Sequence, residues 1–327
     1  MIMIRISFRY MGHHSYTLPH QWQGGLYQHF KELIEMATAE NVEIVEPNSC
    51  LIDLEITGPY APSLNEIKTP FVKKVMRGGY VTFTKGRHLS RRDLAVGVQP
   101  SNHAKKNIWF TGENIRPPQG SWDGYFSFDT NLPSDRSIYF PAWFWTSTNL
   151  FNSTQKTYWG SDVPTIDQLL QERKFERKRK KFCVSFIGKT YPLRLHALEE
   201  LSKIKPVDVY GQSTRKIVHS PNVKAKDYNY ILCFENDIYP GYVTEKPFEA
   251  YTSGTIPLYN GFDKLGYLNS AACINLFEFD DLSSWSQYIL EVDNEITLYK
   301  SIYEQPLLIK RPSLQPAINL IKKLLVY

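Results

Sequence analysis

The sequence predicts an α/β protein made of two Rossmann-like domains that face each other across a cleft. Three observations lead to this prediction: a length of 327 residues, strand-like runs alternating with helical patterns in both halves, and a polar, basic segment between the halves. A chain of this length is enough for two domains of ordinary size. Strands separated by helices pair in parallel through right-handed crossovers. We place the domains at residues 1–160 and 161–310, followed by a helical tail at 311–327.

The first half begins with a strand and an amphipathic helix. Residues 4–8 alternate like a strand, and the apolar residues of 26–39 recur at helical spacing. Short apolar runs bounded by Pro, Gly and Asn then predict further strands. These runs are residues 42–45, 51–56, 81–83, 108–110, 125–128 and 138–145.

The second half repeats the alternation more clearly. The predicted strands are residues 184–188, 207–211, 230–234, 255–259 and 273–276, and the predicted helices are 193–204 and 244–252. The connection before them ends in a basic run at residues 171–181. We interpret this run as a solvated face, with contact to anionic lipid as the alternative.

Composition narrows the class of protein. The net charge of +5 mildly favours an anionic ligand but is too small and too dispersed to indicate nucleic acid. No run approaches the ~20 apolar residues of a membrane helix, and the four cysteines lie far apart. We therefore expect a reduced, cytoplasmic protein. The apolar tail at residues 318–327 either packs on the first domain or touches the inner membrane together with the basic run.

The most informative stretch is a strand, a loop and a helix in the second half. Glu235 and Asn236 follow the strand at its carboxyl end, where open parallel sheets bind ligands. Thr244 is a good N-cap, and a helix start aimed into a cleft binds phosphate. Lys246 adds a positive charge, and Glu245 offers a carboxylate that can accept hydrogen bonds from both ribose hydroxyls. The alternative is a loop and helix with surface charges only.

This stretch, residues 228–261, resembles the signature of the α1,3/4-fucosyltransferases, glycosyltransferase family ten. The shared pattern is Phe-Glu-Asn, a short loop, Tyr-Val-Thr-Glu-Lys, a helix, and a strand that reads Thr-Ile-Pro-Leu-Tyr-Asn-Gly, matched without gaps. The resemblance implies the GT-B fold, with GDP-fucose held by the second domain, Lys246 on the diphosphate and Glu245 on the ribose. The donor-binding residues it implies are Arg194, Asn236, Tyr242, Thr244, Glu245 and Lys246.

Two further segments extend the resemblance. Phe-Cys-Val-Ser-Phe-Ile-Gly at 182–188, followed by Arg194, is similar to the family's strand and donor-phosphate arginine. The turn after it departs from the family, and Lys189 in that turn is a candidate additional phosphate ligand. In the first half, the block around Gly-Glu-Asn at 112–114 matches the segment that carries the family's proposed general base, which would be Glu113.

The chemistry of sugar transfer explains these residue types. Breaking the bond from C1 to the diphosphate requires charge support for departing GDP, which Arg194 and Lys246 can supply. The acceptor hydroxyl requires a base, which Glu113 can supply; the alternative for Glu113 is a helix cap or a partner for Arg116. No Asp-x-Asp or His-rich site is present, so we expect no required cofactor. Loose binding of Mn²⁺ or Mg²⁺ to the diphosphate of the donor stays open as an alternative.

The resemblance implies an inverting α1,3-fucosyltransferase that moves L-fucose from GDP-fucose to an acceptor containing N-acetylglucosamine or glucose. The acceptor would be an oligosaccharide or glycolipid of the Lewis-antigen type, and no nucleic acid is expected as partner. Two alternatives stay open: a transferase for another GDP-deoxysugar, and a non-catalytic module that binds a sugar or nucleotide.

Overall fold

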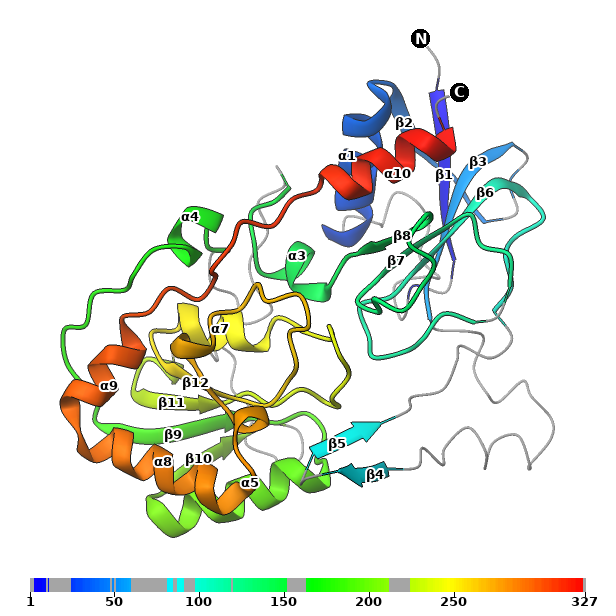
Figure 1. Cartoon of the computed structure of the whole chain (residues 1–327). Helices are drawn as coiled ribbons and strands as arrows, with labels where there is room; N and C mark the ends of the chain where they lie inside the picture. The colour runs from blue at the N-terminus through cyan, green and yellow to red at the C-terminus, as the bar shows by residue number, and fades with distance from the viewer. Residues whose placement is uncertain are drawn as a thin grey trace.

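The computed structural model consists of two α/β lobes lying side by side, as Figure 1 shows. It describes residues 3–9, 11, 25–47, 49, 51–59, 81–84, 87–90, 98–118, 120–151, 163–211 and 224–325. Each lobe contains a parallel sheet, so the predicted α/β class is confirmed. His13, His14, His20 and Cys50 lie outside the described residues.

The first lobe is built on a six-stranded sheet in the order β2-β1-β3-β6-β7-β8. Every neighbouring pair in it is parallel. The strands are β1 (Met3–Arg9), β2 (Asn41–Ile44), β3 (Ile52–Thr57), β6 (Ala104–Phe110), β7 (Gly124–Ser127) and β8 (Ser137–Tyr139). A separate antiparallel pair, β4 (Val81–Thr84) with β5 (Arg87–Ser90), takes up the predicted strand at 81–83, which is therefore not part of the parallel sheet.

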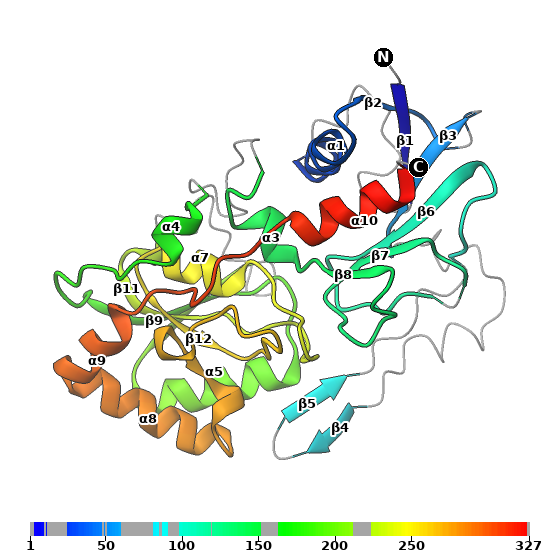
Figure 2. The same ribbon diagram turned by 45° about the horizontal axis from the view of Figure 1, so that its top comes forward.

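Helix α1 (Gly25–Thr38) covers this sheet with the apolar face that the sequence pattern predicts. Its Phe30 ring lies 5.1 Å from that of Phe110 and 5.6 Å from that of Phe126, centroid to centroid. The C-terminal helix α10 (Gln315–Leu325) packs beside α1. Leu320 and Ile321 are buried there. Of the two alternatives for the tail, the structure therefore shows the one in which it packs on the first lobe. Figure 2 shows the chain crossing back to that lobe after the second.

The second lobe has a five-stranded parallel sheet in the order β10-β9-β11-β12-β13. Its strands are β9 (Lys181–Phe186), β10 (Val207–Tyr210), β11 (Tyr228–Leu232), β12 (Ile256–Tyr259) and β13 (Ile274–Asn275). Its helices are α5 (Pro192–Ile204), α7 (Lys246–Thr252), α8 (Leu282–Asn294) and α9 (Ile296–Tyr303), with short 3₁₀ turns η3 (Ser270–Ala272) and η4 (Leu276–Glu278). Two short helices, α3 (Ala142–Thr146) and α4 (Ile166–Leu169), lie in the connection.

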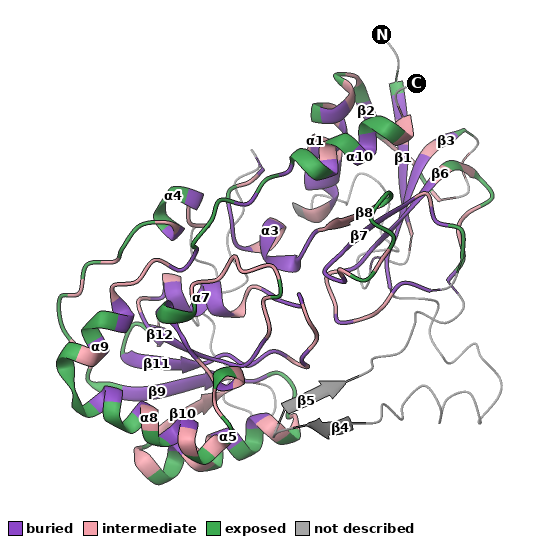
Figure 3. Cartoon of the chain, viewed as in Figure 1, coloured by how far each residue is buried: buried purple, intermediate pink, exposed green. Residues whose placement is uncertain are grey.

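Strand β11 is buried on both faces, as Figure 3 shows for the centre of each sheet. Alternate side chains of a strand point to opposite faces. Tyr230 and Leu232 join the cluster that contains α5 and α8 residues, whereas Ile231 and Cys233 join the cluster that contains Ala250 of α7. Helices on both faces of β11 therefore fix its end, where the candidate site begins.

Two predicted elements differ from the structure. The predicted strand at 138–145 is a short strand followed by α3, because Pro141 stands at the N-cap of that helix and separates the two. The predicted helix at 244–252 begins at Lys246, with Glu245 rather than Thr244 at the N-cap. Thr244 instead turns its hydroxyl to Glu235, at 2.8 Å from Oε2.

The interpretation of the basic run as a solvated face is wrong for two of its residues. The Arg173 guanidinium lies 3.7 Å from the Tyr251 ring centroid and donates to the Tyr251 and Thr255 carbonyls. Lys178 pairs with Asp293 at 2.6 Å. A planar cation stacked on rings and bonded to carbonyls holds the run against the second lobe. Contact of the run with lipid stays a prediction.

Candidate active site

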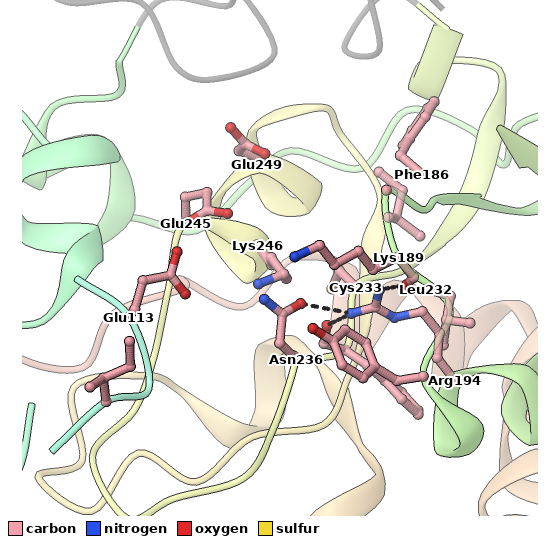
Figure 4. A pocket seen from close by; sticks show the side chains of 15 residues that line it. Glu113, Phe186, Lys189, Arg194, Leu232, Cys233, Asn236, Glu245, Lys246 and Glu249 are labelled. Carbon is pink, nitrogen blue, oxygen red and sulfur yellow. Dashed lines mark hydrogen bonds between the residues drawn. The ribbon is translucent and has the colours of Figure 1, made fainter. Parts of the chain in front are cut away.

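A cavity of about 360 Å³ opens between the lobes, at the carboxyl ends of β6, β9 and β11 and the start of α7. The carboxyl edge of a parallel sheet is where ligands bind in doubly wound folds. The charged and amide side chains that line the cavity are Glu113, Lys189, Arg194, Asn236, Glu245, Lys246 and Glu249. In Figure 4 the three carboxylates lie along one side and the three cations, with Asn236, along the other.

Arg194 lies in the first turn of α5 and is 7% exposed. Its Nη1 donates to the Lys189 carbonyl at 3.0 Å, and its Nη2 donates to the Phe234 carbonyl at 2.7 Å and to Asn236 Oδ1 at 3.3 Å. Burial lowers the pKa of the guanidinium, and attraction to Glu235 opposes that effect. These bonds join three segments of the site. Since an arginine has five N–H donors, the bonds among the described residues leave donors for an anion.

Lys246 is the first residue of α7, and its side chain is 21% exposed. Its ammonium lies 2.9 Å from Glu235 Oε2 and 3.1 Å from the Thr244 hydroxyl oxygen. Two of the three ammonium N–H donors are thus directed into the protein. The predicted set of site residues did not include Glu235, although the Phe-Glu-Asn motif contains it.

Two of the predicted donor-binding residues do not line the cavity. Thr244 is 3% exposed and bonds to Glu235 through both its backbone N–H and its hydroxyl. Tyr242 is also 3% exposed and packs edge-on against the Phe128 ring of the first lobe, at 5.0 Å between centroids. Both side chains face the protein behind the cavity wall.

Glu113 reaches the cavity from the turn after β6. Thr111 shapes this turn, because its hydroxyl donates to the Glu113 carbonyl at 2.8 Å and accepts from the Glu113 N–H at 3.1 Å. The residues that follow, up to 118, are not helical, which removes the helix-cap alternative for Glu113. Arg116 lies over the Tyr239 ring at 3.8 Å and donates to the Asn114 carbonyl at 3.1 Å.

Glu249 is a lining residue that the sequence analysis missed. It is 2% exposed and lies one helical turn after Glu245 on α7, and its N–H donates to the Glu245 carbonyl at 2.9 Å. The spacing of four residues between the two glutamates was the signal that could have found it, because such residues share one face of a helix.

Within the described ranges, no group of three or more His, Cys, Asp or Glu side chains is arranged to hold a metal ion. In the same part of the chain, no helix is long and apolar enough to cross a bilayer. Cys183, Cys233 and Cys273 are buried free thiols. Burial raises the pKa of Cys273 to about 12, so this thiol is unreactive at neutral pH.

Residues 175–305 match the family model of the C-terminal domain of glycosyltransferase family 10 (fucosyltransferase). The α-(1,3)-fucosyltransferase FucT of Helicobacter pylori is 27% identical over 228 residues, which cover 62% of this chain and 47% of that protein. The 4-galactosyl-N-acetylglucosaminide 3-alpha-L-fucosyltransferase 9 of Mus musculus is 27% identical over 208 residues, 56% of each protein. The chain therefore spans about half the length of these curated relatives.

A crystal structure of an α1,3-fucosyltransferase superposes with a TM-score of 0.64 at 19% identity, covering 99% of this chain and 90% of that one. A crystal structure of α1,3-fucosyltransferase with GDP-fucose gives a TM-score of 0.62 at 18% identity, with coverages of 99% and 90%. This likeness establishes the fold, so the chain is a GT-B protein. Within that class, the family match and the curated relatives confirm the resemblance to glycosyltransferase family 10.

Proposed function

We propose that this protein transfers L-fucose from GDP-fucose to a sugar hydroxyl, forming an α1,3 linkage with inversion. The observation that carries the proposal is the cavity to which both lobes contribute. Glu113 comes from the first lobe, and Arg194, Asn236, Glu245 and Lys246 come from the second. The second-lobe residues lie in the segment that matches family 10. The relatives named above as α1,3-fucosyltransferases support the same donor and linkage.

The cation side of the cavity suits the diphosphate of the donor. Arg194 and Lys246 each keep N–H donors that no hydrogen bond between described residues takes up, and Lys189 adds a third positive charge. Fixed cations around departing GDP act where negative charge develops, and each such contact contributes roughly 3–4 kcal/mol in a site that excludes water. We assign the ribose hydroxyls to Glu245.

Glu113, on the carboxylate side of the cavity, suits the acceptor. In the proposed step, the acceptor oxygen bonds to C1 of fucose as the bond from C1 to the β-phosphate oxygen breaks. The electron pair of that bond leaves with GDP, and the acceptor proton passes to the Glu113 carboxylate. Attack on the face opposite the leaving group inverts C1, so β-linked GDP-fucose gives an α-fucoside. We propose an oligosaccharide or glycolipid containing N-acetylglucosamine or glucose as acceptor.

The test is to incubate the protein with GDP-fucose and a panel of galactose–N-acetylglucosamine and galactose–glucose disaccharides. Mass spectrometry should show addition of one deoxyhexose, and NMR should show an α1,3 linkage. A product with another linkage would overturn the α1,3 assignment. GDP-fucose that is neither transferred nor hydrolysed would favour a non-catalytic binding module, and faster transfer from another GDP-deoxysugar would overturn the donor.

The same assay tests the role of metal ions. Because Arg194 and Lys246 are proposed to carry the charge of the leaving group, we expect the rate to be largely retained in EDTA. Loss of activity in EDTA with recovery in Mn²⁺ would show that a divalent ion supports the diphosphate. GDP should also raise the melting temperature more than UDP does, and equal stabilisation would contradict a guanine-specific donor site.

A further inference from the structure

Glu235 is a buried carboxylate directly behind the cavity, and the proposed chemistry does not use it. Its side chain is 0% exposed. It lies just after β11, where its N–H donates to the Asn260 carbonyl at 3.2 Å and holds the chain against the neighbouring strand. An ionised carboxylate in such a place is strongly destabilising unless it is paired and hydrogen-bonded.

Four donors satisfy this carboxylate. Oε1 accepts from the Thr244 N–H at 2.8 Å and from the Tyr259 hydroxyl at 2.9 Å, and Oε2 accepts from the Thr244 hydroxyl at 2.8 Å and from Lys246 Nζ at 2.9 Å. Three of the four donors belong to the protein interior, and only Lys246 also lines the cavity. Among the described residues that line the cavity, Lys246 is therefore the one that hydrogen-bonds to the Glu235 carboxylate.

The geometry at Lys246 follows from this arrangement. Glu235 and Thr244 take two of its three N–H donors, so the direction of the third is set by the tetrahedral nitrogen. In Figure 4 the Lys246 amine points into the cavity beside Asn236. A flexible four-carbon side chain is thereby held in one orientation before any ligand binds, which removes an ordering cost from binding.

The same surroundings also determine the protonation of the Lys246 amine. Desolvation lowers the pKa of this amine, but attraction to Glu235 and Glu245 and the hydrogen bond to Glu235 outweigh it, so its pKa is raised despite repulsion from Arg194. Glu113, Lys189 and Glu249 are the other charged groups that line the cavity. A raised pKa keeps the ammonium protonated well above neutral pH.

We propose that Glu235 is a positioning residue: it holds the Lys246 ammonium in place and aims its remaining N–H at the donor diphosphate. This inference depends on the proposed function, because it assumes that Lys246 binds the diphosphate. Glu235 does not line the cavity, so we expect its effect on the rate to pass mainly through Lys246, to which it is hydrogen-bonded.

The test compares Glu235→Gln with Tyr259→Phe. Glu235→Gln keeps the shape but removes the charge, so we expect kcat to fall about 10- to 100-fold, because small misplacements of a catalytic group cost that much. GDP affinity should change little, because the lost pre-orientation of Lys246 weakens binding while the loss of the competing Glu235 anion strengthens it. The alkaline fall in kcat and in GDP affinity should begin at lower pH, because the pKa of Lys246 is no longer raised.

Tyr259→Phe is the matched control, because it removes one hydrogen bond from the same carboxylate and leaves the pair with Lys246 intact. It should lower the melting temperature and leave the pH profiles unchanged. A double-mutant cycle completes the design: in a Lys246→Ala background, Glu235→Gln should have little further effect on kcat, because the residues act as a unit.

Additive losses in the cycle, or equal pH profiles for the wild type and Glu235→Gln, would overturn the inference and leave Glu235 a purely structural group. Failure of the proposed function has a different signature. A wild-type protein that binds GDP with the expected pH dependence but transfers no fucose would overturn only the function. A protein that binds no GDP would overturn both.

Discussion

Lys246 and Arg194 offer positive charge to the same cavity, but the protein holds them differently. The Lys246 amine is paired with a buried carboxylate, whereas the Arg194 guanidinium is bonded to two carbonyls and an amide oxygen. Carbonyls supply partial negative charge only, so Arg194 keeps more of its charge for a ligand. Through these hydrogen bonds the Arg194 guanidinium also links the turn after β9 to the end of β11. Arg194 therefore organises the site as well as charging it.

Substitution of these two cations tests the proposed diphosphate site. Lys246→Ala removes a charge that we propose acts on the departing diphosphate, so kcat should fall by about 10²-fold or more. The melting temperature should fall as well, because the buried Glu235 carboxylate loses its ion pair. Arg194→Lys should lose both rate and thermal stability, because an ammonium cannot bridge three oxygens in a planar fork. Kinetics and melts on one preparation measure both. A near-wild-type rate in both variants would contradict the proposed diphosphate site.

Glu113→Gln tests the proposed base. The amide keeps the size of the side chain but cannot accept the acceptor proton, so transfer should fall about 10²-fold or more while GDP binding is retained. The melting temperature should stay close to that of the wild type, because the turn at Glu113 is held by Thr111 through backbone atoms of Glu113. Full activity in a destabilised Gln variant would direct the search for the base to Asp123, Asp129 and the histidines at 13, 14 and 20.

At the scale of elements, the basic run at residues 171–181 is attached to α8 through Asp293. The Asp293 side chain is 4% exposed and pairs with Lys178 and Lys205. Desolvation raises the pKa of Asp293, but hydrogen bonds from the two lysines outweigh it and the pKa is lowered. A carboxylate with a lowered folded-state pKa stabilises the fold at pH values above its unfolded pKa.

Asp293→Asn should therefore destabilise the protein at neutral pH. The wild type loses this contribution as the pH falls below the ordinary Asp value of 3.8 and through the lower folded-state value. The difference in unfolding free energy between the wild type and the Asn variant should shrink over that same acid range. Urea titrations at several pH values measure it. A difference that is independent of pH would show that the pairs with Lys178 and Lys205 contribute little.

At the scale of the whole molecule, the lobes meet through the loop that follows Asn236. Gly241 in this loop has φ +90, and a Cβ there would lie 2.5 Å from the Phe128 carbonyl oxygen of the first lobe. The Tyr139 hydroxyl of the first lobe donates to the Gly241 carbonyl at 3.0 Å. A second junction is the stacking of Trp143 on Phe248, at 4.8 Å between ring centroids. These contacts lie between the lobe that carries Glu113 and the lobe that carries Arg194 and Lys246, so we expect them to fix how the two sides of the cavity face each other.

Gly241→Ala should disturb this approach. The clash involves backbone on both sides, so the lobes must shift, and we expect transfer to fall about 10-fold or more while GDP binding is largely retained. Gly266→Ala is the matched control, since Gly266 has φ +63 but open space around it. Both variants carry backbone strain of about 1 kcal/mol or more, but only Gly241→Ala should reduce transfer per folded molecule. Equal rates in the two variants would contradict the role of this contact.

Much of the second lobe could be predicted from the sequence, because its signals are local. The apolar run that became β11, the Phe-Glu-Asn after it and the cation at the start of α7 are contiguous. The periodicity of apolar residues and the residue types at the ends of helices and strands can be recognised without knowing any long-range contact. A motif without gaps also indicates which residues lie in the same turn. The fold class and the resemblance to family 10 followed from these features, and both are confirmed.

The tertiary structure decided which side chains face the cavity and which face the protein interior. Thr244 and Glu235 lie beside residues that line the cavity, yet both point inward, because a buried carboxylate needs its donors nearby. Packing also moved Arg173 from an expected solvated face onto two tyrosine rings and brought the C-terminal helix to the first lobe. Side-chain direction and the meeting of Glu113 with Lys246 depend on contacts between distant segments, which no local pattern in the sequence encodes.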